Sequence, residues 1–108
     1  NHFDWGDPQL AEIKQKYIDR FGEEKPELNV VMGYDMVYFV KACIENAGST
    51  DPEALRSAIE NAKDIQLTHA LITIDPETHD PLDKDAVILK LTDNETHFVE
   101  RYSPRNAK

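Results

Sequence analysis

Residues 29–48, with the sequence NVVMGYDMVYFVKACIENAG, are the most apolar stretch of the chain and decide its fold. Apolar side chains recur there at the three- and four-residue spacing of one helical face, at Val31, Tyr34, Val37, Tyr38 and Ala42. Other apolar residues cover most of the remaining circumference, which predicts a central helix packed on several sides. Gly48 follows where a left-handed C-terminal cap would end this helix.

A shorter amphipathic helix is predicted on each side of the central one. Residues 1–7 read as an extended lead-in, and Asp7 before Pro8 is typical of a helix start. The apolar stripe of this first helix consists of Leu10, Ile13, Tyr17 and Phe21. After the polar loop 23–27 and the central helix, residues 51–52 (Asp-Pro) begin a third helix, although residues 50–53 also fit a capping box.

The last third of the chain has the two-residue period of β-strands. Strands are predicted over residues 67–75, 86–91 and 96–102, and Asp93-Asn94 is typical of a hairpin turn between the last two. The prediction is therefore an α/β chain of about three helices followed by a small three-stranded antiparallel meander.

Composition and charge narrow the classes of partner. The chain has 108 residues and a formal net charge of −9, from 21 acidic and 12 basic side chains. This charge disfavours nucleic acid and anionic membranes as partners. No run of 18 apolar residues could span a bilayer, and the first residues show no signal-peptide pattern. The single Cys43 falls inside the central helix and has no cysteine to pair with.

No constellation of residues predicts catalysis or metal binding. The histidines His2, His69, His79 and His97 are not spaced as metal ligands. Residues 75–80 resemble a calcium loop only faintly, because they lack its central glycine and closing glutamate, so we interpret them as a charged turn. No serine lies in a nucleophile motif, and the four glycines are scattered. We expect no enzyme, no cofactor and no metal.

One short motif in the central helix, Gly33-Tyr34-Asp35, has two interpretations. The motif can have a packing role only, and this is the interpretation that the composition favours. Alternatively, the glycine lets a ligand approach the backbone, the phenol forms a pocket wall, and the positive end of the helix attracts a carboxylate.

The order of several motifs resembles a known family. These are FDWGDP (3–8), YIDRFG (17–22), VMGYDMVYFVKACIENAGSTDPEALRSAI (31–59), LITIDPETHDPLDKDAVILKL (71–91) and HFVERYSP (97–104). Together they resemble the C-terminal portion of the type I periplasmic binding proteins, the solute receptors of ABC importers. The branch that they resemble most is the leucine/isoleucine/valine-binding-protein-like receptors. The resemblance covers about residues 3–104.

The resemblance implies an architecture. Receptors of this family have two α/β lobes with the ligand in the cleft between them, and 108 residues are too few for two lobes. The chain would be a C-terminal fragment. Residues 1–7 would be a hinge or lead-in, residues 8–75 mostly elements of the N-terminal lobe, and residues 76–104 strands returning towards the hinge.

The resemblance also implies a function. The intact protein would bind a branched-chain or other amino acid and pass it to ABC permease subunits, in the periplasm or lipid-anchored outside the cell. Tyr34 matches an aromatic residue that lines the side-chain pocket, whereas Gly33 and Asp35 would have helix-entry and structural roles. Most groups that hold the ligand's ammonium and carboxylate would lie outside these residues. His69 stands where relatives usually have glycine.

Two other functions remain open at this stage. The same fold could serve as the ligand-sensing module of a receptor, or the chain could be a free-standing small α/β interaction domain. In a fragment, apolar helix faces would need covering, which predicts a homodimer or a domain swap.

Overall fold

The computed structural model describes residues 4–22, 28–68 and 70–107 of the chain. The helices of this part are η1 (Pro8–Leu10), α1 (Ala11–Phe21), α2 (Leu28–Ala47), α3 (Pro52–Glu60) and η2 (Pro104–Ala107), where η denotes a 3-10 helix. The strands are β1 (Ile65–Gln66), β2 (Leu71–Ile74), β3 (Pro81–Leu82), β4 (Ala86–Thr92) and β5 (Glu95–Tyr102). The predicted α/β class, with three α-helices followed by antiparallel strands, is confirmed.

The helix ends form where the local sequence predicts them. The Asp7 carboxylate accepts a hydrogen bond from the Gln9 amide (3.0 Å) and so caps η1, a short 3-10 turn that leads into α1. Of the two predicted caps of α3, Asp51 is the one observed, because its carboxylate accepts from the Ala54 amide at 3.2 Å. Gly22 and Gly48 have φ of 75° and 65°, the left-handed conformation that ends a helix.

Two segments differ from their predictions. Residues 4–7 form a turn rather than an extended lead-in, because the Asp4 carbonyl accepts from the Asp7 amide at 3.0 Å. Of the strand predicted over residues 67–75, only Leu71–Ile74 forms a strand, β2; it pairs with β1, which lies just before the predicted span, and the Leu67 amide between them donates to the Ala70 carbonyl at 2.8 Å. His69 and the loop 23–27 lie outside the described residues.

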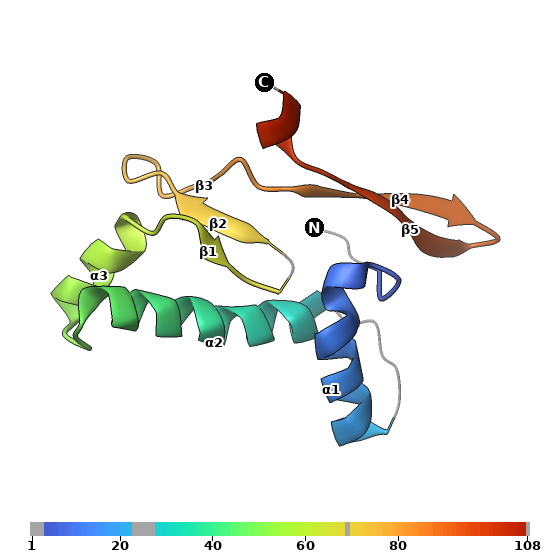
Figure 1. Cartoon of the computed structure of the whole chain (residues 1–108), viewed down its shortest axis with the longest axis horizontal. Coiled ribbons are helices and arrows are strands. Elements are labelled where there is room, and N and C mark those ends of the chain that lie inside the picture. The colour runs from blue at the N-terminus through green and yellow to red at the C-terminus, as the bar shows by residue number, and fades with distance from the viewer. Residues whose placement is uncertain (1–3, 23–27, 69, 108) are drawn as a thin grey trace.

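The strands form two sheets, and one of them is a small three-stranded antiparallel meander. One sheet has the order β1-β2-β3, and β4 and β5 form a hairpin of their own. Asp93 and Asn94 make its turn with φ of 53° and 62°, the positive angles that a two-residue type I′ loop requires. Figure 1 shows β1 and β2 lying along α2, while the hairpin extends away beyond the end of α2 where α1 packs.

The hydrophobic core is divided into two clusters along α2. The first joins the N-terminal half of α2 to η1 and α1, with buried Trp5, Leu10, Ile13 and Val31. The second joins its C-terminal half to α3 and the first sheet, with buried Cys43, Ala62 and Ile65. Within the described part of the chain, no helix is long and apolar enough to cross a membrane.

The prediction that α2 is covered on several sides is wrong for part of its circumference. Val31 and Cys43 are fully buried, but Met32, Met36, Val37 and Tyr38 are exposed. The all-round apolar pattern therefore does not show which sides of the helix are covered.

Candidate ligand-binding site

Tyr34 lies on the side of α2 that faces α1. Its hydroxyl accepts a hydrogen bond from the Lys16 ammonium (2.9 Å), and it lies 3.3 Å from the hydroxyl of Tyr38. The two tyrosine rings are neighbours because residues four apart share a helical face, and their centroids are 4.9 Å apart. Lys16 is one helical turn after Glu12 on α1, and its ammonium also contacts the Glu12 carboxylate at 2.7 Å.

A shallow depression of about 190 Å³ lies beside this cluster. It is lined by Glu12, Tyr34, Tyr38, Gln66, Leu67 and Thr68. Three parts of the chain therefore meet there: α1, α2 and the end of β1 with the residues that follow it. The lining offers two phenol hydroxyls and one carboxylate beside apolar ring surface, which are groups that can hold a small polar molecule.

Gly33 and Asp35 do not lie at the helix entry, because α2 begins at Leu28. Asp35 is buried, and its carboxylate accepts a hydrogen bond from the Thr68 amide at 2.9 Å. It holds the segment after β1 against α2 and so positions one wall of the depression. A structural role for Asp35 is what this contact supports. Apart from its chain neighbours and the backbone of α2 itself, no atom of the described residues lies within 4 Å of the place where a Cβ on Gly33 would be.

A larger groove adjoins Tyr34 on the other side, between α1 and the start of α2. Its volume is about 610 Å³, and it is lined by Ile13, Lys16, Tyr17, Asp19, Arg20, Phe21, Val30 and Tyr34. Tyr34 thus separates two hollows of the surface. One has a polar lining and the other has an apolar floor with charged side chains at its edge.

The remaining candidates of the sequence form no site in the described residues. His79 lies in the charged turn, 3.5 Å from the Glu60 carboxylate, and His97 is exposed on β5; His2 and His69 are outside the described part. The Asp75 carboxylate closes that turn by accepting from the amides of Glu77 and Thr78. Burial raises the pKa of the Cys43 thiol, which keeps it protonated. No group of three or more metal-ligating side chains occurs in the described residues.

The sequence motif singled out Tyr34 as a candidate but not the residues around it. The four-residue spacing of Tyr34 and Tyr38 was visible and could have paired them. Lys16 and Thr68 lie 18 and 34 positions away, and no local pattern connects them to Tyr34. Their proximity depends on how α1 and β1 pack on α2.

We expect the pKa of Tyr34 to be lower than that of Tyr38. The Lys16 ammonium, which donates to the Tyr34 hydroxyl, lowers the pKa of Tyr34, and hydrogen bonding to Tyr34 raises the pKa of Tyr38. We expect the first tyrosine ionisation in an NMR titration of labelled tyrosine rings to belong to Tyr34, below its ordinary value of 10.0. Lys16→Met removes the cation, so the pKa of Tyr34 should rise towards that value. Unchanged titration in Lys16→Met would show that the contact does not persist in solution.

Comparison with known proteins shows what fold this chain has. No protein-family model matches the sequence, and neither does any curated protein. Among solved structures, the chain is similar to the leucine-binding protein LivK from Thermotoga maritima, with a TM-score of 0.72 and 24% sequence identity. The match covers 98% of this chain and 30% of the LivK chain, so these residues span less than a third of that protein's length. Across almost its whole length, the chain has the fold of part of that leucine-binding protein.

Proposed function

We propose that these residues are part of a solute-binding protein that captures a branched-chain or other amino acid for an ABC importer. The observation that carries this proposal is the similarity of fold to a leucine-binding protein over 98% of the chain. The protein would bind its solute without chemical change, since binding proteins of this kind have no catalytic step.

The position of Tyr34 supports the proposal that this residue forms part of the ligand site. Its ring and that of Tyr38 offer apolar surface to an aliphatic side chain, and their hydroxyls border the same depression. Glu12, which is paired with Lys16 at 2.7 Å, adds a carboxylate to the lining, a group that can accept a hydrogen bond from the ammonium of an amino acid. The other groups that hold the ammonium and carboxylate of the amino acid would come from the rest of a two-lobed protein.

The remaining features of the proposal follow from the same fold. Residues 8–75 would belong mostly to the N-terminal lobe and residues 76–104 would return towards the hinge. The protein would work in the periplasm, or lipid-anchored outside the cell, and would deliver its solute to permease subunits.

Tyr34→Ala provides the test, made in the intact two-lobed protein that contains these residues. Leucine, isoleucine and valine are titrated calorimetrically into the unaltered protein and the variant. Loss of the aromatic wall should raise the Kd of the preferred amino acid about tenfold, corresponding to about 1.4 kcal/mol. Tyr34→Phe keeps the ring and loses only the hydroxyl, so its loss of affinity should be smaller.

Tyr102→Ala is the matched control, because Tyr102 is a half-exposed tyrosine on β5 and does not line the depression. The affinity of the Tyr102→Ala variant for the amino acid should equal that of the unaltered protein. An unchanged Kd in Tyr34→Ala would remove Tyr34 from the ligand site. Failure of the unaltered protein to bind any amino acid would contradict the proposed function itself.

A further inference from the structure

A short chain of hydrogen bonds leads from Lys16 through Tyr34 to Tyr38. The Lys16 ammonium lies 2.9 Å from the Tyr34 hydroxyl, which lies 3.3 Å from the Tyr38 hydroxyl. An ammonium has donors and no acceptor, so the first of these hydrogen bonds runs from Lys16 to Tyr34. The roles of the two phenols as donor and acceptor depend on this fixed end.

The charge of Lys16 decides which phenol donates to the other. The Tyr34 oxygen already receives one proton from the ammonium, and the positive charge beside it opposes a second proton directed at the same oxygen. The Tyr34 hydroxyl therefore donates to Tyr38 instead of accepting from it. The acidities agree with this direction, because the hydrogen bond from Lys16 lowers the pKa of Tyr34, and the stronger acid of a pair is the better donor.

The proton of Tyr38 is left over when these two hydrogen bonds are made. In the part of the chain that the structure describes, Tyr38 has no hydrogen-bond partner besides Tyr34. Its side chain lines the depression beside Tyr34, and the residue is 46% exposed. The O–H group of Tyr38 is therefore available to an acceptor on a molecule that enters the depression.

Other polar groups of the lining have partners within the chain. The Glu12 carboxylate contacts the Lys16 ammonium at 2.7 Å, and the Thr68 amide donates to the buried Asp35 carboxylate at 2.9 Å. Compared with these groups, Tyr38 offers a proton that no acceptor of the described residues receives. What the depression lacks at Tyr38 is an acceptor.

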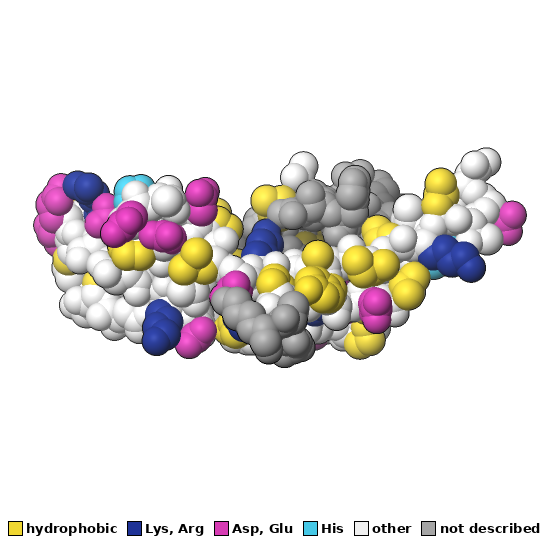
Figure 2. Space-filling view, turned by 90° about the horizontal axis from the view of Figure 1, so that it is seen from above, with side chains coloured by type: hydrophobic (Ala, Val, Ile, Leu, Met, Phe, Trp, Pro, Cys, Tyr) yellow, Lys and Arg dark blue, Asp and Glu magenta, His cyan; other side chains and the backbone are white. Residues whose placement is uncertain are grey.

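Acidic side chains crowd a different part of the surface. On the face seen in Figure 2, Asp and Glu side chains gather at the end of the molecule where α3 lies. The depression lies where α1, α2 and the end of β1 meet, and the one carboxylate of its lining, Glu12, is paired with Lys16. A ligand carboxylate therefore meets less repulsion beside Tyr38 than at the α3 end.

We propose that the Tyr38 hydroxyl donates a hydrogen bond to the carboxylate of the bound amino acid, and that Lys16, acting through Tyr34, holds it in the donor role. Tyr38 is then a ligand-binding residue and Lys16 a positioning residue. A hydrogen bond to a charged acceptor is about twice as strong as one between neutral groups, and each hydrogen bond in a chain polarises the next. The role of Tyr38 rests on the proposed function, because it concerns the same bound amino acid.

Tyr38→Phe tests this role in the intact two-lobed protein that contains these residues. Phenylalanine keeps the ring and removes only the hydroxyl. Leucine, isoleucine and valine are titrated calorimetrically, and the Kd of the preferred amino acid should rise at least about tenfold. Tyr102→Phe is the matched control, because it removes the hydroxyl of a tyrosine on β5 that is 50% exposed and does not line the depression. The Kd in Tyr102→Phe should not change.

A spectroscopic measurement identifies the acceptor. The preferred amino acid is labelled with ¹³C at its carboxylate carbon and bound to saturation. The chemical shift of this carbon should differ between the unaltered protein and Tyr38→Phe, because the carboxylate loses a hydrogen bond, and should be the same in Tyr102→Phe. An identical shift in Tyr38→Phe would overturn the assignment to the carboxylate, even with a raised Kd.

The double variant Lys16→Met with Tyr38→Phe tests the positioning role of Lys16. Without the ammonium, the direction of the hydrogen bond between the phenols is no longer fixed. The rise in Kd caused by Tyr38→Phe should therefore be smaller in Lys16→Met than in the unaltered protein. Equal rises in both backgrounds would overturn the role of Lys16.

The failure of this proposal differs from the failure of the proposed function. An unchanged Kd in Tyr38→Phe, with an unaltered protein that binds the amino acid, would overturn the role of Tyr38 and leave the proposed function standing. This is the result expected if another part of the polypeptide covers Tyr38. An unaltered protein that binds none of the three amino acids would contradict the proposed function and the role of Tyr38 together.

Discussion

Replacing Arg101 by alanine is expected to lower the free energy of unfolding by about 3–5 kcal/mol, because it leaves a buried carboxylate without its partner. Arg101 on β5 forms an ion pair and a hydrogen bond with the carboxylate of Asp7, the residue that caps η1. The side chains are only 13% and 2% exposed. This contact joins the two ends of the described chain, 94 positions apart.

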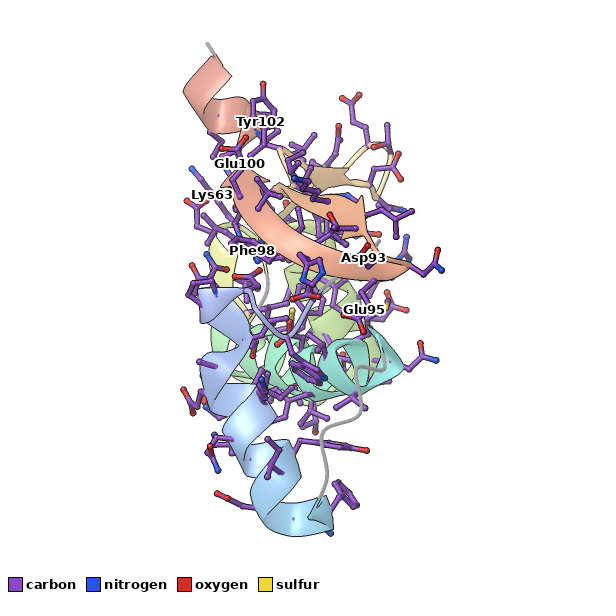
Figure 3. The ribbon with its side chains drawn as sticks, turned by 90° about the vertical axis from the view of Figure 1, so that its right-hand side faces the viewer. Lys63, Asp93, Glu95, Phe98, Glu100 and Tyr102 are labelled. Carbon is purple, nitrogen blue, oxygen red and sulfur yellow. The ribbon has the colours of Figure 1, made fainter. Side chains whose placement is uncertain are left out.

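The geometry of the hairpin explains why this pair matters for the fold. Figure 3 shows Phe98 on the side of the hairpin towards the N-terminal part of the chain, with Asp93 and Glu95 near its tip. A Cβ at Gly6 would lie 3.7 Å from the Cβ of Phe98, so the turn at residues 4–7 contacts β5 directly. An isolated two-stranded hairpin is marginally stable in water, so β4 and β5 depend on this contact.

Chemical denaturation of Arg101→Ala and of Arg56→Ala provides the comparison. Arg56 pairs with Glu60 at 3.0 Å on the surface of α3, where the arginine side chain is largely exposed, so its removal should cost less than about 1 kcal/mol. Equal losses in the two variants would show that the Asp7–Arg101 pair acts as an ordinary surface ion pair.

Asp35→Ala is expected to have the second largest effect, a loss of about 2–3 kcal/mol of unfolding free energy. The buried carboxylate accepts from the Thr68 amide, a partner 33 positions away, and alanine leaves that amide without this acceptor. The segment after β1 should loosen where it lines the depression beside Tyr34. Hydrogen exchange of the Thr68 amide measures this directly, and it should become faster in Asp35→Ala.

Asp35→Asn is the matched variant for this measurement. Its amide oxygen can still accept from Thr68 while the charge is removed, so the loss of stability and of amide protection should be smaller. Unaltered exchange of Thr68 in Asp35→Ala would contradict the role of Asp35 in holding this segment.

The proposed ligand site shows which of its residues a local sequence pattern can predict and which it cannot. Tyr34 could be singled out from its motif, but the neighbours that make a site of it come from α1 and from the residues after β1. Hydrogen bonds such as that of Lys16 to Tyr34 join positions with no common period, so only the packing of the helices reveals them. The Asp7–Arg101 pair is hidden from the sequence for the same reason.

The sequence by itself determined the features that depend on neighbouring residues. Asp7 and Asp51 cap helices because their carboxylates reach amides two and three positions on, and Gly22 and Gly48 end helices because glycine accepts positive φ. Asp93 and Asn94 turn the hairpin for a similar reason. Only the tertiary structure decided which side of α2 is covered, how residues 65–74 divide into two strands, and which strands pair. These depend on contacts between distant segments, and hydrophobic periodicity shows that a face is apolar without showing what packs against it.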